Sequence, residues 1–309
     1  MKILLYHFGY YGDIIVVGQN FAKELKVRYP SCEISLMVRP RINYINDIIK
    51  PLNLFNEVIY GEKSDFYTLK NKFERSYLID EYVYPEGNLR TIFTKAGFPF
   101  RQHKLNLEFE ESHIAIARQI IGDLSSPIIT TQDDMCRKWD EDKVKSFQGK
   151  LLKLGQVIVL GPDVVHFPIN RKISFLESCA VAHLSDIFVG IDSGIAHGAA
   201  LSGTQTVLIP PLIPEFYISP TEYDNQYIKH ENKKHISIRP DSNDFCGNYK
   251  CFKGTKKSAV EQPIGNPLKV KCNWKKKYFF SHKPSCFTKI SVSMFYDRVE
   301  SILEKRNLI

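Results

Sequence analysis

Several features are missing from this sequence, and each absence excludes a class of protein. No apolar run approaches the roughly 18 to 20 residues that a membrane-crossing helix needs, so we expect no transmembrane segment. The 309 residues contain no internal repeat and no low-complexity tract, which excludes repeat and fibrous architectures. With 43% hydrophobic and 25% charged residues, the composition is that of an ordinary soluble protein. The beginning, "MKILLYHFGYYGD", lacks a small-residue cleavage site, so we expect a first strand of a cytoplasmic protein.

Two short sequence motifs with fixed spacing are also missing. The first strand-to-helix turn, "FGYYGDII", contains Gly9 and Gly12 but no G-x-G-x-x-G pattern. Asp13, which opens the following helix, would repel a phosphate, so dinucleotide binding at this turn is disfavoured. No two cysteines form a C-x2-C pair, which weakens the case for a common zinc finger.

The length and the hydrophobic pattern indicate two α/β domains, because 309 residues exceed the usual size of one core. The first alternation has strands at 2–8, 33–39, 55–60 and 76–84 and helices at 14–30 and 88–98. The second has strands at 127–131, 157–161, 186–191 and 206–210 and helices at 141–155, 174–184 and 194–203. A short strand at 235–239 and a helix at 292–306 follow.

This pattern predicts two Rossmann-like domains, each with a parallel sheet and helices on both faces, and a ligand in the cleft between them. We expect the first domain at 1–125 and the second at 126–309, joined by a turn-rich linker at 122–127. The second domain would include a Cys-rich segment at 240–290 and the terminal helix.

The last part of the chain is basic. From Lys229 to Ile309 there are 18 Lys and Arg against 7 Asp and Glu, whereas the whole chain has a net charge of +8. A basic segment of this kind is typical of contact with nucleic acid, a membrane surface or a small anion, or it is simply a solvated face.

The seven cysteines fall into two groups. Cys32, Cys136 and Cys179 are scattered, and we expect them to pack as small core residues. Four others lie in the basic segment, namely Cys246, Cys251, Cys272 and Cys286. Because disulfides are rare in a cytoplasm, one tetrahedral Fe or Zn site is the preferred interpretation of these four thiols, and four unligated thiols are the alternative.

The stretch "FVGIDSGIAHGAAL" contains the strongest candidate site. Asp192 ends a strand, Ser193 and Gly194 begin a helix, and His197 lies one turn further along the same helix face. A helix N-terminus at the carboxyl edge of a parallel sheet offers N–H groups to an anion, and glycine allows a close approach. The pattern suits a diphosphate; a plain helix cap and a core histidine are the alternative.

Two other junctions bear on this choice. Asp13 is either a helix cap or a general base facing the cleft. The stretch "TTQDDMCRKW" offers the hydroxyls of Thr130 and Thr131 and the adjacent cations Arg137 and Lys138, which suits a second grip on phosphate. Asp133 and Asp134 would fit a divalent metal, although such a loop pair is more often solvated.

At these junctions the sequence resembles glycosyltransferase family nine, the bacterial heptosyltransferase group with the GT-B fold. That family has a Gly-x-x-Gly-Asp first turn, a Thr-Thr segment leading through a basic residue to a Trp, and an Asp-Thr/Ser-Gly-x-x-His signature. The matching positions here are Gly9 to Asp13, Thr130 to Trp139, and Asp192 to His197. Compared with the family's spacing, two extra residues lie between Thr131 and the basic position, so either Arg137 or Lys138 takes that position. The resemblance covers about residues 1–210.

The resemblance implies transfer of a sugar, typically heptose from ADP-heptose, with inversion and without a catalytic metal. Asp13 would be the base, with Gly9 and Gly12 forming the acceptor-side turn. The donor-binding residues would be Thr130, Thr131, Arg137, Lys138, Asp192, Ser193, Gly194 and His197. The family members that glycosylate autotransporter proteins have a four-Cys iron-binding finger near the C-terminus, which makes a protein serine an acceptor class beside the lipopolysaccharide core. A homo-oligomer is compatible with this interpretation.

Two other functions compete. One is a GT-B transferase that uses a different nucleotide sugar, because adenine contacts leave little trace in a sequence. The other belongs to a different class: a nucleic-acid-binding protein with a metal finger, in which "KVKCNWKKKYFF" would stack and neutralise a single strand.

Overall fold

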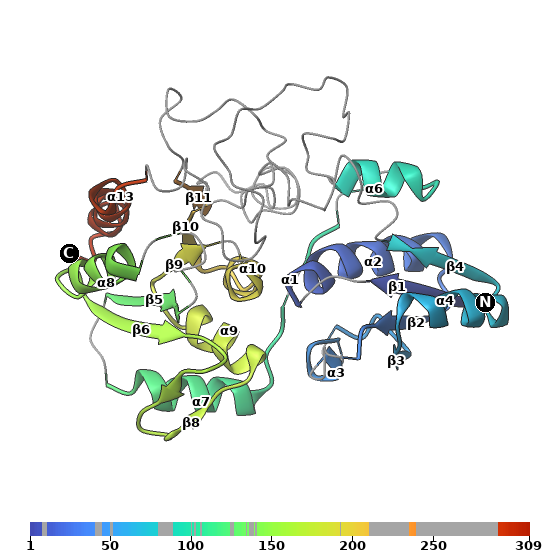
Figure 1. Cartoon of the computed structure of the whole chain (residues 1–309), viewed down its shortest axis with the longest axis horizontal. Coiled ribbons are helices and arrows are strands. Elements are labelled where there is room, and N and C mark those ends of the chain that lie inside the picture. The colour runs from blue at the N-terminus through green and yellow to red at the C-terminus, as the bar shows by residue number, and fades with distance from the viewer. Residues whose placement is uncertain are drawn as a thin grey trace. The chain divides into compact units, whose positions relative to one another are not determined.

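The chain folds into two α/β units in a computed structural model (Figure 1). The structure describes residues 1–7, 11–40, 45–49, 52–79, 89–99, 101, 103–105, 107–123, 127–133, 135, 139, 141–191, 193–209, 235–238 and 290–309. Of these, it gives only the backbone at 13, 46, 89–91 and 237. Among the described residues, the first unit comprises 1–110 and the second begins at Glu111.

The first unit is built on a four-stranded parallel sheet in the order β3-β2-β1-β4. Its strands are β1 (Lys2–His7), β2 (Glu33–Val38), β3 (Glu57–Tyr60) and β4 (Arg75–Leu78). All but the first residue of both β1 and β2 are buried. A strand that is buried on both faces is typical of a parallel sheet covered by helices, as the sequence predicted.

The helices of the first unit differ in detail from the expected ones. They are α1 (Tyr11–Asp13), the π-helical turn η1 (Ile14–Gly18), α2 (Gln19–Arg28), α3 (Ile45–Ile49), α4 (Lys63–Leu69), the 3₁₀ turn η2 (Lys70–Lys72) and α6 (Leu89–Lys95). The sequence predicted one regular helix over 14–30. Instead, the helical run begins at Tyr11 and contains a π turn, which hydrophobic periodicity cannot reveal. Gly97 follows α6 with a φ of +78°, as expected for a glycine that ends a helix.

The second unit is built on a five-stranded parallel sheet in the order β11-β10-β9-β5-β6. Its strands are β5 (Ile128–Gln132), β6 (Gln156–Leu160), β9 (Ile187–Ile191), β10 (Gln205–Ile209) and β11 (His235–Ser237). The helices are α7 (Glu111–Ile121), α8 (Glu141–Leu151), α9 (Phe175–His183), α10 (Gly194–Leu201) and α13 (Val292–Lys305). A short antiparallel hairpin, β7 (Val165–His166) and β8 (Arg171–Lys172), was not predicted from the sequence.

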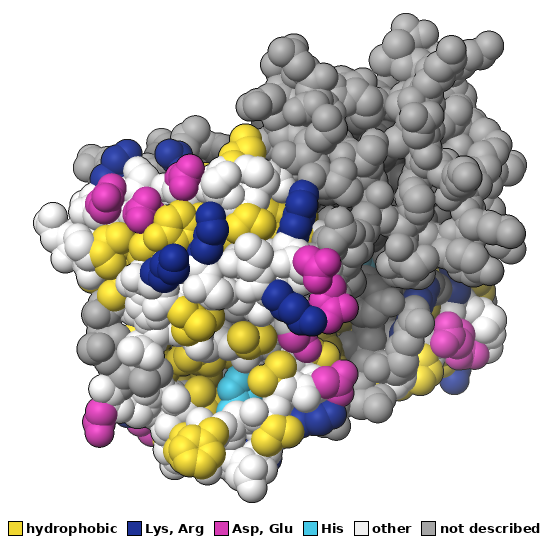
Figure 2. All heavy atoms as spheres, turned by 60° about the vertical axis from the view of Figure 1, so that its left-hand side comes forward, with side chains coloured by type: hydrophobic (Ala, Val, Ile, Leu, Met, Phe, Trp, Pro, Cys, Tyr) yellow, Lys and Arg dark blue, Asp and Glu magenta, His cyan; other side chains and the backbone are white. Residues whose placement is uncertain are grey.

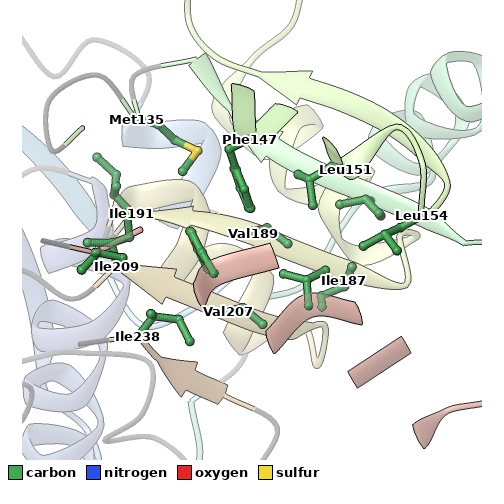
Figure 3. Packing of buried hydrophobic residues seen from close by; sticks show 14 of the residues in the cluster. Met135, Phe147, Leu151, Leu154, Ile187, Val189, Ile191, Val207, Ile209 and Ile238 are labelled. Atoms are coloured by element: carbon green, nitrogen blue, oxygen red, sulfur yellow. The ribbon is translucent and has the colours of Figure 1, made fainter. Parts of the chain in front are cut away.

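The main core of the second unit lies between the sheet and the pair α8 and α13. Figure 3 shows Phe147 and Leu151 of α8 on the same side of the sheet as Val189 and Ile187 of β9. Phe147 and Phe295 stack with ring centroids 4.6 Å apart, and Trp139 meets both rings edge-on. The C-terminal helix therefore belongs to the core of this unit.

The division between the units comes earlier in the chain than the expected boundary at 125. Helix α7 packs against α9 and so belongs to the second unit. The sequence analysis missed this helix and took the turn that follows it for the linker. Among the described residues, no helix combines the length and the apolar character needed to cross a membrane.

Candidate functional site

The carboxyl ends of the parallel strands in the second unit meet along one edge of the sheet. Ile191 ends β9 there, and Gly194 starts α10 only three positions later. Ser193 and Gly194 therefore lie at the edge where open α/β sheets bind ligands.

Ser193 is the N-cap of α10. Its backbone is extended, with φ −158° and ψ 170°, and its hydroxyl accepts a hydrogen bond from the N–H of Ala196 at 3.1 Å. The carbonyl of Ser193 accepts from the N–H of His197 at 3.0 Å. No described residue accepts a hydrogen bond from the N–H groups of Gly194 and Ile195, the other donors of the first turn. These two donors and the positive end of the helix dipole suit an anion.

The rest of α10 packs tightly into the second unit. Ala196, Ala199 and Ala200 are wholly buried, and His197 is only 3% exposed. Their small side chains let α10 approach α9 and β10 closely. His197 therefore lies in the interior, one turn from the N-terminus that it was predicted to assist.

Thr130 and Thr131 are interior residues of β5. Successive side chains of a strand point to opposite faces, so the two hydroxyls cannot grip one group together from within the strand. The Thr130 hydroxyl donates to the carbonyl of Ile187 at 3.2 Å, and the Thr131 hydroxyl lies 3.3 Å from the sulfur of Met135. Both threonines are wholly buried. Their hydroxyls tie the strand to its neighbours.

Gln132, the last residue of β5, contacts the candidate anion site directly. Its Oε1 accepts a hydrogen bond from the Ser193 hydroxyl at 2.9 Å. The sequence analysis did not select Gln132, although a polar residue at the end of a buried strand is a signal that could have found it. Asp133, the next residue, lies over Gly161 at the end of β6, where a Cβ would collide with its carboxylate.

Trp139, which ends the predicted Thr-Thr motif, is a core residue. Its ring is wholly buried between Phe147 and Phe295, and the backbone N–H of Trp139 donates to the carbonyl of Met135 at 3.0 Å. The motif thus ends in an anchor for the helix pair α8 and α13. Arg137 and Lys138 lie outside the described residues.

The predicted acceptor-side turn belongs to the first unit. Gly12 is buried, and the backbone of Asp13 is the third residue of the helical run that starts at Tyr11. Asp13 therefore lies inside the first turn of the helical run, and both roles predicted for it, helix cap and general base, stay predictions. The π turn η1 follows immediately, and such turns occur frequently at functional sites. Gly9 and the side chain of Asp13 lie outside the described residues.

The cysteine predictions can be compared only in part. Cys32 and Cys179 are buried free thiols, as expected of core residues, and burial raises the pKa of the Cys179 thiol far above its ordinary value. The other cysteines and Asp192 lie outside the described residues; these cysteines are Cys136, Cys246, Cys251, Cys272 and Cys286. In the described part of the chain, no cluster of three or more His, Cys, Asp and Glu side chains could hold a metal ion.

Comparison with known proteins gives a result at the level of structure. No protein-family profile matches the sequence, and no curated protein matches it. A solved family 9 glycosyltransferase from Veillonella parvula DSM 2008 matches with a TM-score of 0.62 at 12% identity, covering 98% of this chain and 97% of that one. The chain has the fold of the family-nine glycosyltransferases. The expected α/β class with two parallel sheets is thereby confirmed.

Two further structures share this glycosyltransferase fold. The ADP-heptose lipopolysaccharide heptosyltransferase II of E. coli matches with a TM-score of 0.58 at 14% identity, over 99% of this chain and all of that one (100%). The dodecameric iron-containing heptosyltransferase TibC, solved with ADP-D-β-D-heptose, matches with a TM-score of 0.62 at 12% identity. That match covers 100% of this chain and 76% of TibC. The edge that carries Ser193 and Gln132 is thus part of a fold whose solved examples include sugar transferases.

Proposed function

We propose that the protein is an inverting glycosyltransferase that transfers heptose from ADP-heptose to a hydroxyl group of a protein or of a lipopolysaccharide core. The observation that carries the proposal is the Ser193-capped start of α10, which sits at the ligand-binding edge of a family-nine glycosyltransferase fold. Solved relatives in fold include enzymes that are named for ADP-heptose.

In this proposal the second unit holds the donor. The N–H groups of Gly194 and Ile195 bind the diphosphate, and Arg137 or Lys138 adds a positive charge. Ser193 and His197 shape the first turn of α10, and Asp192 links that turn to β9. Thr130 and Thr131 hold the end of β5 from inside the sheet. Preorganised donors of this kind stabilise the negative charge that grows on the leaving diphosphate.

The first unit supplies the base. Asp13 takes the proton of the acceptor hydroxyl, whose oxygen then attacks the anomeric carbon of the sugar. The bond from that carbon to the diphosphate oxygen breaks, and ADP leaves with the electron pair. Attack on the face opposite the leaving group inverts the anomeric centre, and no catalytic metal takes part.

A structural metal, assembly and location complete the proposal. The thiolates of Cys246, Cys251, Cys272 and Cys286 form a donor set suited to one structural Fe or Zn ion, and TibC is described as iron-containing. TibC is also described as dodecameric, which supports a homo-oligomer here. We place the protein in the cytoplasm. Elemental analysis should give about one Fe or Zn per chain, from the four-ligand arithmetic, and a fully stable metal-free protein would contradict this site.

A binding panel tests the function. The purified protein is titrated with ADP-heptose, GDP- and UDP-sugars and single-stranded DNA, and binding is followed by calorimetry. We expect ADP-heptose to bind and then to be consumed when an acceptor, either a serine-containing peptide or heptose-free lipopolysaccharide core, is added. If a GDP- or UDP-sugar binds and ADP-heptose does not, that nucleotide sugar becomes the assigned donor. Binding of DNA alone would overturn the enzyme assignment.

One face of the second unit bears on the nucleic-acid alternative. Figure 2 shows this face, on which Lys and Arg side chains lie among Asp and Glu side chains. Strong nucleic-acid binding draws on a concentrated basic surface, and the described residues on this face do not form one.

A further inference from the structure

We propose that Gln132 is a positioning residue for the diphosphate-binding turn: its side-chain amide fixes the Ser193 hydroxyl, and Gly190 keeps open the space in which that amide lies. This inference rests on the proposed donor site and adds two residues, Gln132 and Gly190, to it.

The position of Gln132 at the end of β5 directs its side chain toward the start of α10. Gln132 shares a strand face with Thr130, whose hydroxyl bonds the neighbouring strand β9. Gln132 is only 2% exposed and ends β5, which lies between β9 and β6, so its amide must find partners inside the protein. One of these partners is the Ser193 hydroxyl, 61 positions further along the chain.

Gly190 leaves the space that this contact requires. A Cβ built on Gly190 would lie 2.8 Å from Oε1 of Gln132 and 3.1 Å from its Cδ and Cγ atoms. Contacts this short would force the amide out of its place. Gln132 and Gly190 are therefore a matched pair, in which the missing side chain of one makes room for the other.

The hydrogen bond to Gln132 determines which other groups the Ser193 hydroxyl can bind. A serine hydroxyl has one hydrogen to donate, and this one goes to Gln132 while a lone pair accepts from Ala196. The hydroxyl is held from both sides and has no hydrogen left for a phosphate. The first turn consequently presents the N–H groups of Gly194 and Ile195 to the anion, and Gln132 keeps that turn in place.

The test is a double-mutant cycle on donor affinity. Gln132→Met has nearly the same length but only a weak sulfur acceptor, and we expect it to weaken ADP-heptose binding by about three- to tenfold, the effect of one hydrogen bond. Ser193→Ala should weaken binding at least as much, because it also removes the cap to Ala196. The double variant should bind no more weakly than Ser193→Ala alone, because Gln132 acts through the Ser193 hydroxyl. The rate at saturating donor should change less than the affinity.

Gly190 provides a reciprocal test. Gly190→Ala should reproduce the loss of affinity, whereas in a Gln132→Ala background the same change should have no further effect because the space is empty. Gly149→Ala is the matched control, since a Cβ at Gly149 on α8 meets no atom within 4 Å. If Gly190→Ala does not fold, the Gln132→Met and Ser193→Ala cycle decides alone.

The outcomes separate this inference from the proposed function. A wild-type protein that binds none of the nucleotide sugars overturns both. Wild-type binding with unchanged affinity in Gln132→Met overturns the positioning role alone. Strictly additive effects of Gln132→Met and Ser193→Ala would also overturn it, because independent residues do not couple.

Discussion

The strand-to-helix junctions of the two units start their helices in different ways. After β9, a serine caps a regular helix of small residues, and two N–H groups remain for a ligand. After β1, the helical run starts before Asp13, passes through the π turn η1, and enters α2 without a side-chain cap. In the proposed function the capped junction binds an anion, whereas the π turn is an irregularity of the kind that occurs frequently at functional sites.

The two helices also differ in what they bury. Helix α10 buries mainly small residues, while α2 buries the polar residues Gln19, Asn20 and Glu24. The amides of Gln19 and Asn20 donate to the carbonyls of Ile15 and Val16 in the π turn, at 3.3 and 3.1 Å. These two hydrogen bonds from the start of α2 therefore stabilise the π turn η1. At one junction a side-chain cap starts a regular helix, and at the other buried amide side chains hold an unusual backbone.

Glu24 shows how the first unit compensates for a wholly buried carboxylate. Its Oε2 lies 2.9 Å from Nε2 of His103, and its Oε1 lies 3.8 Å from Nε of Arg101. Lys23, the preceding residue, donates to the carbonyl of Lys104 at 2.5 Å. Since a buried charge requires partners, these contacts tie α2 to the segment that leads out of the first unit.

The largest expected effect separates chemistry in the first unit from binding in the second. Asp13→Asn should lower the transfer rate by about 100- to 10,000-fold, the usual contribution of a general base. Donor affinity should remain, because the donor residues lie in the second unit. The free energy of unfolding should change by less than about 1 kcal/mol, because a charge near a helix N-terminus contributes typically about 0.3 to 1 kcal/mol. Steady-state kinetics, calorimetry and thermal unfolding measure these quantities, and near-normal transfer would remove Asp13 from the mechanism.

The second prediction concerns the independence of the two cores. Phe295→Ala empties a buried site between Trp139 and Phe147, and we expect it to destabilise the second unit by about 3–5 kcal/mol. Hydrogen exchange should show faster opening of β9 and β10, with no change in β1 and β2. Leu152→Ala, at a residue that is 63% exposed, is the control and should cost under about 0.5 kcal/mol. Equal acceleration in both sheets would show that the units unfold together.

The third prediction concerns the capped junction itself. Gly194→Val places a branched side chain in the first turn of α10, where it should crowd the diphosphate and weaken ADP-heptose binding by at least about tenfold, or 1.4 kcal/mol. Gly149→Val, in the open space beside α8, should leave affinity unchanged. Calorimetry compares the two variants. Unchanged affinity in Gly194→Val would move the donor away from this helix.

The smallest expected effect is a pH dependence confined to the second unit. Burial lowers the pKa of His166, so the unfolded chain takes up a proton before the folded one as the pH falls. The contribution of neutral His166 to stability is complete above its unfolded pKa of about 6.5 and is lost as the pH falls toward the lower folded pKa. Denaturant unfolding between pH 7 and 5 should show it, and a His166→Gln variant with an unaltered pH slope would contradict it.

Much of the fold could be predicted from the sequence because its signals are local. Alternating apolar strands and periodic helices predicted both parallel sheets, and Gly97 marked a helix end. The start of α10 was readable because serine and glycine at a strand end favour a capped helix. Helix α7 was missed because a turn-rich stretch beside it resembles a linker, and only its packing against α9 assigns it to the second unit.

What the sequence by itself determined is thus the class of fold, the order of its elements and the residue types at each junction, since these depend on near neighbours along the chain. The tertiary structure alone decided that Gln132 bonds Ser193 across 61 positions and that Gly190 leaves room for the contact. It also decided that the chain after β1 adopts a π turn. These features depend on which strands lie side by side and on which buried polar atoms must find partners, and no local pattern carries that information.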